Sequence, residues 1–236
     1  MKKQLLVAVA AGFIGTSAMA QSAFEGFYGQ LGVGYENNSV SSRTLNVTAK
    51  PSDSTTGSQG VQGAPTSSGG GFSSSIGLGY NYSVAPQWLI GIGADYVPTS
   101  VTTSTQNAIN CTGCDGVPTN NYKVNNRYSI FITPGYEISK DQLVYLKGGY
   151  SSQKVAYQVQ SNGSANFTNN VNGWVAGLGF KQLLDKNLYV FGEGNYYSYS
   201  SYSWSATSGS GSTLQTFTGT QTPSAYQFLV GVGYKF

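Results

Sequence analysis

The end of the chain carries the strongest constraint, a strict alternation of side-chain type. From Tyr226 to Phe236 every second residue is large and apolar, and the residues between are mostly small or polar. A period of two is that of a β-strand whose two faces meet different environments. Seven other segments show the same pattern. The predicted strands are Phe27–Glu36, Phe72–Tyr82, Trp88–Tyr96, Arg127–Glu137, Val144–Tyr150, Trp174–Lys181, Leu188–Tyr196 and Tyr226–Phe236.

The second face of these strands decides between two kinds of barrel. A soluble barrel of the lipocalin kind has an apolar interior and a polar exterior. Here the face opposite the large residues carries Gly, Ser, Asn and charged side chains, which could not form a dry core. Large groups toward lipid and small or polar groups toward a narrow lumen satisfy the pattern. We therefore predict an all-β fold, a closed antiparallel eight-stranded transmembrane β-barrel built as an up-and-down meander.

The connections between these strands alternate in length. Short turns are expected at Ser83–Gln87, Ile138–Gln142 and Leu183–Asn187, and long polar, structureless loops at Asn37–Gly71, Val97–Asn126, Ser151–Asn172 and Tyr197–Pro223. Short turns at one end and long loops at the other are typical of outer-membrane barrels, whose short turns face the periplasm.

Aromatic residues mark both ends of the predicted strands. The upper ends carry Tyr35, Phe72, Tyr96, Tyr128, Tyr150, Trp174, Tyr196 and Tyr226, and the lower ends carry Phe27, Tyr80, Tyr82, Trp88, Tyr136, Phe180, Tyr234 and Phe236. In five strands the two aromatics are eight residues apart, which in tilted strands spans roughly 20 Å of bilayer. Amphipathic rings at both interfaces are expected of a membrane protein.

The start of the chain has the order of a secretory signal peptide. Basic Lys2 and Lys3 precede the apolar run Leu5–Ile14, and small residues lead up to Ala20. The run is too short to span a bilayer. We expect cleavage after Ala20, so that residues 1–20 are the signal peptide and residues 21–236 form the barrel domain.

The composition argues against several functions. Without Lys2 and Lys3 the formal net charge of +3 falls to +1, which offers no footprint for nucleic acid. The sequence contains no His, which removes the usual general base and the commonest transition-metal ligand. We therefore expect no enzyme activity, no cofactor and no metal site. The repeated Gly-x-Gly pairs open no helix and are interpreted as small residues that leave room for neighbouring lumen side chains.

Two cysteines lie in the second long loop, at Cys111 and Cys114. A redox site would need a βαβ context, and zinc would need further ligands. In an oxidising compartment a local disulfide is the favoured interpretation.

Charged residues on the lumen face are balanced in sign. The negative set is Glu36, Asp95, Glu137 and Glu193, and the positive set is Arg127, Lys147, Lys181 and Lys235. Because unpaired charges in a confined lumen are costly, we expect pairing across it, with Arg127, Lys147 and Lys181 reaching Asp95, Glu137 or Glu193. A selectivity ring is the functional alternative, and it would need an excess of one sign at one level.

The chain resembles small outer-membrane β-barrels of the OmpA/OmpX-like superfamily. The resemblance rests on the signal peptide, the opening Phe27–Gly32, the Gly-x-Gly-Tyr strand ends and the closing Val232–Phe236. The chain ends at the last predicted strand, so the peptidoglycan-binding domain of full-length OmpA proteins is not expected. The resemblance implies that the barrel-assembly machinery reads the terminal aromatics Tyr226, Phe228, Tyr234 and Phe236. It also implies passage through the periplasm with chaperones, and contact with outer-membrane lipid and lipopolysaccharide.

Two functional classes remain open. The first is a structural and interaction barrel, a monomer in the cell outer membrane that stabilises the envelope and presents loops for adhesion or contact with a host or cell-surface ligand. The second is a small porin for ions or small solutes.

Overall fold

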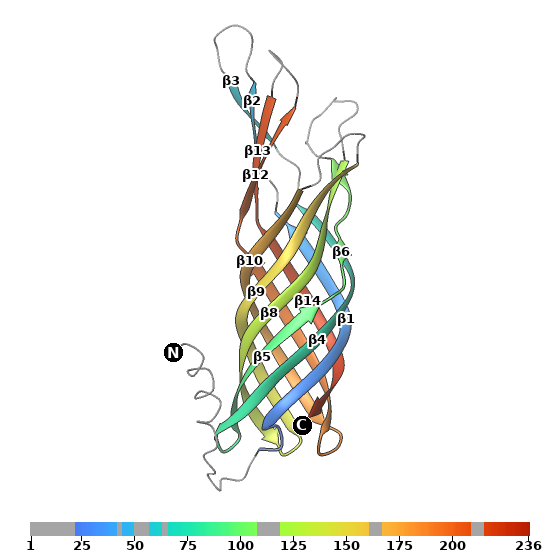
Figure 1. Cartoon of the computed structure of the whole chain (residues 1–236), viewed down its shortest axis with the longest axis vertical. Helices are drawn as coiled ribbons and strands as arrows, with labels where there is room; N and C mark the ends of the chain where they lie inside the picture. The colour runs from blue at the N-terminus through green and yellow to red at the C-terminus, as the bar shows by residue number, and fades with distance from the viewer. Residues whose placement is uncertain are drawn as a thin grey trace, which may run out of the picture.

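Eight long antiparallel strands form a closed ring in this computed structural model, which describes residues 22–41, 44–49, 57–62, 66–107, 119–160, 167–208 and 215–236 (Figure 1). These strands are β1 (Gly26–Val40), β4 (Ser67–Ala85), β5 (Trp88–Val97), β8 (Thr119–Ser139), β9 (Gln142–Gln160), β10 (Phe167–Leu183), β11 (Leu188–Tyr199) and β14 (Pro223–Lys235). The predicted eight-stranded all-β meander is confirmed. Within the described segments, no helix combines the length and the apolar character needed to cross a membrane.

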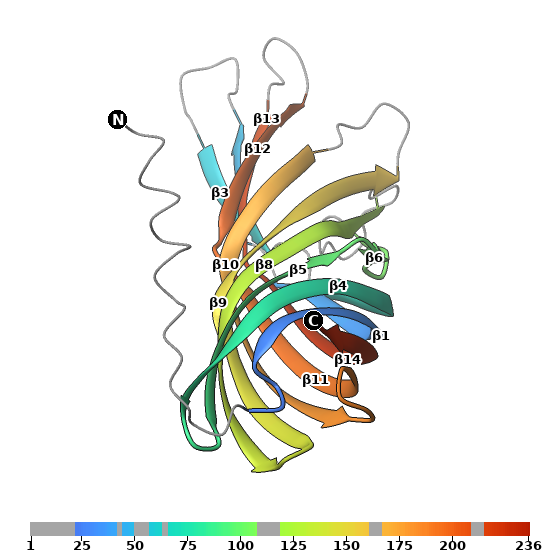
Figure 2. The ribbon, with the colours of Figure 1, turned by 60° about the horizontal axis from the view of Figure 1, so that its bottom comes forward.

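Two pairings close the ring. Strand β14 returns to β1, with Val232 opposite Leu31. Strand β5 pairs directly with β8, and the short strands β6 (Val101–Thr102) and β7 (Gln106–Asn107) pair with the upper part of β8. Figure 2 shows the tilted strands wrapping around the barrel axis. The described ring therefore leaves no unpaired edge in the wall, as a membrane-spanning sheet requires.

The two faces of the wall differ as the alternation predicts. On the outside, Leu78 is 66% exposed and Val230 is 64% exposed, whereas lumen-facing Phe131 is only 4% exposed. The upper aromatic belt consists of the eight predicted upper residues, and neighbouring strands pair them directly: Tyr35 with Phe72, Tyr96 with Tyr128, Tyr150 with Trp174, and Tyr196 with Tyr226. At the lower end Phe27 pairs with Tyr80 and Trp88 with Tyr136. Both belts thus ring the wall at defined levels.

Above the upper aromatic belt the polarity of the wall is reversed. Outward positions become polar, as at Asn37, Lys154 and Asn172. Apolar side chains gather in the lumen beside buried polar ones such as Asn120 and Gln221. They form the upper apolar cluster, which consists of Val40, Tyr122, Val124, Val155, Val171, Val175, Tyr197, Tyr199 and Ala225. This part of the barrel has the inside-apolar arrangement of a soluble protein, so the membrane boundary lies at the upper aromatic belt.

A β-bulge in β8 separates these two regimes. The pairing with β9 shifts between Asn125 and Tyr128, and Asn126 has a positive φ of 51°. Asn tolerates this left-handed conformation better than most residues, and a bulge inserts one unpaired residue. Lumen-facing positions are therefore odd-numbered below the bulge, as at Arg127, and even-numbered above it, as at Val124.

A second sheet extends beyond the upper end of the barrel. It contains β2 (Thr44–Ala49), β3 (Gly57–Gln62), β12 (Tyr202–Ser208) and β13 (Gln215–Gln221), in the order β12-β13-β2-β3 (Figure 1). The prediction of structureless loops at 37–71 and 197–223 is therefore wrong for these segments. Their ladders are made by backbone hydrogen bonds, which need no alternation of apolar residues.

Candidate functional site in the barrel lumen

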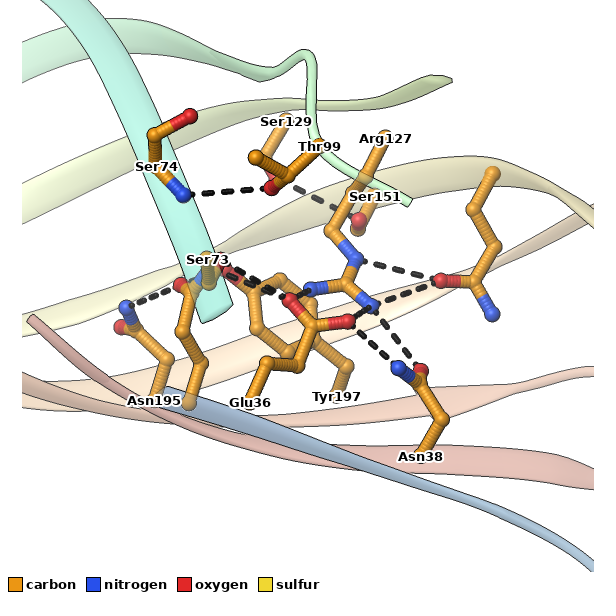
Figure 3. A network of polar contacts seen from close by, with 12 residues as sticks. Glu36, Asn38, Ser73, Ser74, Thr99, Arg127, Ser129, Ser151, Asn195 and Tyr197 are labelled. Carbon is orange, nitrogen blue, oxygen red and sulfur yellow. Dashed lines mark hydrogen bonds and ion pairs between the residues drawn. The ribbon is translucent and has the colours of Figure 1, made fainter. Parts of the chain in front are cut away.

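Arg127 and Glu36 form the upper charged contact of the lumen. Two guanidinium nitrogens of Arg127 donate to the two carboxylate oxygens of Glu36, at 2.6 and 2.8 Å, which is a bidentate geometry (Figure 3). Arg127 Nε also donates to Gln153 Oε1 at 3.1 Å. The guanidinium carbon lies 4.2 Å from the centre of the Tyr197 ring. With Arg127 only 1% exposed, the pair is fully removed from solvent.

Amide and hydroxyl groups complete the coordination of the Glu36 carboxylate. Asn38 Nδ2 donates to Oε1 at 2.6 Å, and Ser73 Oγ donates to Oε2 at 3.2 Å. Gln227 Nε2 donates to both Glu36 and Ser73. Such saturation is what a buried charge needs to be tolerated. The contacts tie β1, β4, β8, β9 and β14 together across the lumen.

Lys147 joins two carboxylates below this pair. Its Nζ donates to Asp95 Oδ2 at 2.6 Å and to Glu193 Oε1 at 2.9 Å. Tyr145 donates its hydroxyl to the other oxygen of Glu193 at 2.7 Å. Asn195 donates both to Glu193 and to Gln227, so the two charged layers form one hydrogen-bonded network.

Lys181 is placed differently from the expected ion pair. Among the described residues it has no carboxylate within ion-pair distance, and instead its Nζ lies over tyrosine rings. The ring centres of Tyr28, Tyr189 and Tyr145 are 3.9, 4.8 and 5.3 Å away. Cation–π contacts of this kind stabilise a cation without a counter-ion. Nothing in the sequence indicated that these three tyrosines surround Lys181.

The remaining two expected charges lie near the lower mouth. Glu137 is buried and accepts a short hydrogen bond from the Ser22 hydroxyl. Lys235 is half-buried, and its backbone N–H donates to Asn187. Neither side chain takes part in an ion pair in the segments that the structure describes. Arg127 pairs with Glu36 and with none of the three carboxylates expected for it.

Lumen glycines and lumen rings are complementary. A Cβ atom on Gly79 would lie 2.5 Å from the Tyr28 hydroxyl, and one on Gly93 would lie 2.7 Å from the Phe131 ring. The same holds for Gly179 beneath Tyr145, at 2.1 Å. Real Cβ atoms do not come this close to a neighbour, so these glycines make room for the rings. The rings are buried inside the barrel as a result.

An apolar layer also closes the lower mouth. Phe24 precedes β1 and is 3% exposed, and it packs with Leu89 and Leu143. Together with the upper apolar cluster, it places apolar side chains at both ends of the charged layers. Phe24 and most residues of the upper apolar cluster, such as Val40 and Val124, lie outside the strands predicted from the alternation, so the sequence carried no expectation for them.

Three further predictions concern the two ends of the chain and the second long loop. The terminal aromatics Tyr226, Phe228, Tyr234 and Phe236 all face outward, and their reading by the assembly machinery stays a prediction. The expected disulfide at Cys111 and Cys114 and the signal peptide 1–20 lie outside the described residues. In the segments that the structure describes, no cluster of His, Cys, Asp and Glu could hold a metal ion.

Comparison with known proteins identifies the class. The family "outer membrane protein beta-barrel domain" matches residues 6–236. The chain belongs to this family, and its place is the cell outer membrane.

Two solved structures, with TM-scores above 0.5, share the fold at low sequence identity. The outer membrane protease OmpT from Escherichia coli aligns at 8% identity with a TM-score of 0.53, over 94% of this chain and 100% of that chain. The outer membrane protein OprG from Pseudomonas aeruginosa aligns at 16% identity with a TM-score of 0.52, over 91% and 98%. Ail of Yersinia pestis, solved with a heparin analogue, aligns at 12% identity with a TM-score of 0.42, over 89% and 99%. No curated protein matches the sequence.

Proposed function

We propose that the protein is an occluded outer-membrane barrel that stabilises the envelope and holds an extracellular β-sheet for contact with a host or cell-surface ligand. The observation that carries the proposal is the series of buried side-chain layers along the lumen. From the upper apolar cluster, through the pair of Arg127 and Glu36 and the contacts of Lys147, to Phe24 at the lower mouth, successive layers of buried side chains cross the barrel. An eight-stranded barrel is just narrow enough to be filled in this way.

The same filling argues against the porin and enzyme alternatives. A selectivity ring needs one sign of charge in excess at a water-filled constriction, whereas Arg127 and Glu36 neutralise each other without solvent. Catalysis needs an accessible base or nucleophile, and the chain has no His. We therefore propose that the protein has no enzyme activity and no cofactor.

Conductance tests this function directly. In planar bilayers the refolded protein should show small, intermittent conductance at most. The control is a variant with Phe131→Ala and Tyr145→Ala, which lacks two lumen rings and should conduct more. Its larger conductance would show that the assay can detect an opened lumen. Both proteins should first be shown to be folded by their change in gel migration on boiling in SDS. A steady, wide and ion-selective channel in the unmutated protein would support the porin function and end the proposal.

The orientation and the lipid partner follow from the charges on the outer wall. Lys123 and Lys154 lie on the outward side of neighbouring strands β8 and β9, just above Tyr128 and Tyr150 of the upper aromatic belt. In the described segments, no acidic side chain lies on the outward wall at this level. Two cations at the membrane boundary fit the phosphates of an anionic lipid headgroup. We propose that this end faces outward and that these lysines contact lipopolysaccharide, while the short turns face the periplasm.

Replacement of the two lysines tests the lipid contact. In native mass spectrometry, Lys123→Gln with Lys154→Gln should reduce the number of lipid A molecules retained per barrel several-fold. The matched control is Lys140→Gln with Lys186→Gln, which removes the same charge from the lower turns and should retain lipid A as the unmutated protein does. Equal retention by both double variants would contradict the proposed contact.

A further inference from the structure

Strand β3 is an open edge of the sheet above the barrel. The strand order β12-β13-β2-β3 gives it one neighbour, β2, with Thr44 opposite Gln62 and Ala49 opposite Gly57. In the segments that the structure describes, no strand pairs with its other side. The backbone N–H and C=O groups along such an edge can form a ladder with a further strand.

The sequence of β3 has none of the features that usually protect an edge strand. The common protections are a charged residue, a proline or a bulge. Strand β3 reads GSQGVQ, and its pairing with β2 runs without a shift in register. The other three strands of the sheet, which read TLNVTA, YSWSATS and QTFTGTQ, also lack charged residues. Two identical copies of this sheet would therefore meet without repulsion between like charges.

The opposite edge of the sheet, β12, is less open. The N–H of Ser200 donates to the carbonyl of Asn172 on β10 at 2.8 Å, and β12 begins two residues later at Tyr202. Strand β10 extends beyond Asn172 to Phe167, so the barrel rim lies next to the base of β12. Strand β3 is therefore the edge that offers its backbone to a partner.

Strand β3 runs back toward the membrane. Strand β13 leads directly into β14 of the barrel, so its last residues lie nearest the rim. The register of β2 with β13 sets Leu45 opposite Gly219 and Ala49 opposite Gln215, so β2 rises away from the rim. Because β3 is antiparallel to β2, it descends (Figure 1). All copies of β3 in one membrane therefore run in the same direction.

We propose that β3 pairs antiparallel with the β3 strand of a second copy of this chain in a facing membrane. The joined sheet then has one barrel at each end, because the two β3 strands run in opposite directions. The pairings within the described sheet are already antiparallel. Copies in a single membrane cannot form this ladder. The proposal rests on the outward orientation proposed above, and it makes the cell-surface ligand of the proposed function a copy of the protein on another cell.

The two faces of the sheet set the register of this pair. Residues directly opposite each other share a face. Val61, Leu45 and Trp204 therefore share one face, and the other face contains only Ser, Thr, Asn, Gln and Gly residues. Both faces stay continuous when Gln59 of one copy lies opposite Gln59 of the other, on a two-fold axis. Glutamine can pair with itself in this way, because its amide both donates and accepts hydrogen bonds.

Clustering of lipid vesicles tests the contact between membranes. The barrel is folded into vesicles of two fluorescent colours, and protease shows which end faces outward. The two colours should become coincident, because many weak pairs act together. Gln59→Lys and Gln59→Glu should each lower the coincidence several-fold, since like charges then meet at the two-fold axis. Vesicles with Gln59→Lys mixed with vesicles with Gln59→Glu should cluster again.

The matched control is Ser205→Lys on β12, which adds the same charge to the other edge and should leave clustering unchanged. Absence of clustering in the unmutated protein with the sheet outward, or an equal loss from Gln59→Lys and Ser205→Lys, would overturn the proposal. Clustering with vesicles that lack the protein would make lipid the partner and would overturn it as well.

Cysteine cross-linking locates the pair. In protein with Cys111→Ser and Cys114→Ser, Gln59→Cys should form a disulfide-linked dimer on oxidation, because Cα atoms opposite each other lie about 4.5–5.5 Å apart. With one vesicle population isotope-labelled, mass spectrometry should find dimers that contain one copy from each population. Ser205→Cys should stay monomeric. Dimers only within one population, or equal dimer formation by both variants, would rule out the facing β3 pair. The conductance of the lumen is measured separately, so the occluded barrel can stand if this pairing fails.

Discussion

Lys147→Ala is expected to be the most damaging single substitution in the lumen. Lys147 is the cation that both Asp95 and Glu193 contact. Without it the two carboxylates stay buried and lose their ion pairs. Removal of one partner from a buried ion pair costs roughly 3–5 kcal/mol. The free energy of unfolding, measured with urea in lipid vesicles, should fall by an amount in that range. A leak in planar bilayers should accompany it, because the side chain also covers the Phe131 ring.

A neutral triple variant serves as the control. Lys147→Met with Asp95→Asn and Glu193→Gln removes all three charges but keeps similar volumes. Because no uncompensated charge remains, its free energy of unfolding should lie much closer to that of the unmutated protein. If Lys147→Ala changes stability by less than about 0.5 kcal/mol, as surface substitutions do, the charged network is not what holds this layer together.

Phe236→Ala should lower the amount of protein that reaches the outer membrane several-fold. The Phe236 side chain is 77% exposed, and its backbone N–H donates to Phe27 at the seam between β14 and β1. The substitution keeps the backbone contact and removes an outward ring, so barrel refolded in detergent should lose less than about 1 kcal/mol. Quantitative membrane fractionation and detergent unfolding measure the two effects separately.

An aromatic ring at the other end of the wall provides the matched control. Phe72 is 63% exposed and also faces outward, but it lies in the upper aromatic belt on β4, which β1 separates from the terminal strand β14. Phe72→Ala should leave the amount in the membrane nearly unchanged if the assembly machinery reads the terminal aromatics. A similar fall for both variants would mean that any outward ring supports assembly, and an equal loss in both assays would make Phe236 a packing residue only.

Where the wall crosses the membrane, the fold could be predicted from the sequence. A period of two with apolar side chains on one face is a strong signal, because lipid and lumen make opposite demands on neighbouring residues. The signal ends where the demands change. Above Arg127 the bulge at Asn126 switches the lumen-facing residues of β8 from odd to even numbers. The strand begins at Thr119, before the alternation starts at Arg127. Segments such as β3, with the sequence GSQGVQ, carry no alternation, and backbone pairing alone makes them strands.

The residues of the candidate site could be predicted from the sequence, and Lys147 meets two of the carboxylates expected for it, but Arg127 and Lys181 do not. Alternation was enough to place Glu36, Arg127 and Lys147 on the lumen face. The choice of partner depends on tilt and register across the barrel, which bring together residues 91 positions apart in the case of Arg127 and Glu36. The tyrosines around Lys181 come from β1, β9 and β11. Their rings fit only because the neighbouring strands have glycines, which lack a side chain, at the positions that the rings contact. Such contacts are properties of the closed ring.

The reversal of polarity at the upper aromatic belt gives the barrel a single stable depth in the bilayer. A downward displacement by two residues, about 6–7 Å along a strand, would draw Asn37, Asn172 and Lys154 toward hydrocarbon. A lipid-facing lysine costs up to about 2–4 kcal/mol at the midplane of the bilayer. An upward displacement would expose outward apolar side chains just below the upper aromatic belt, such as Val33 and Ile130, to water. Displacement in either direction is therefore unfavourable. The sheet of β2, β3, β12 and β13 is held at a constant distance from the lipid headgroups.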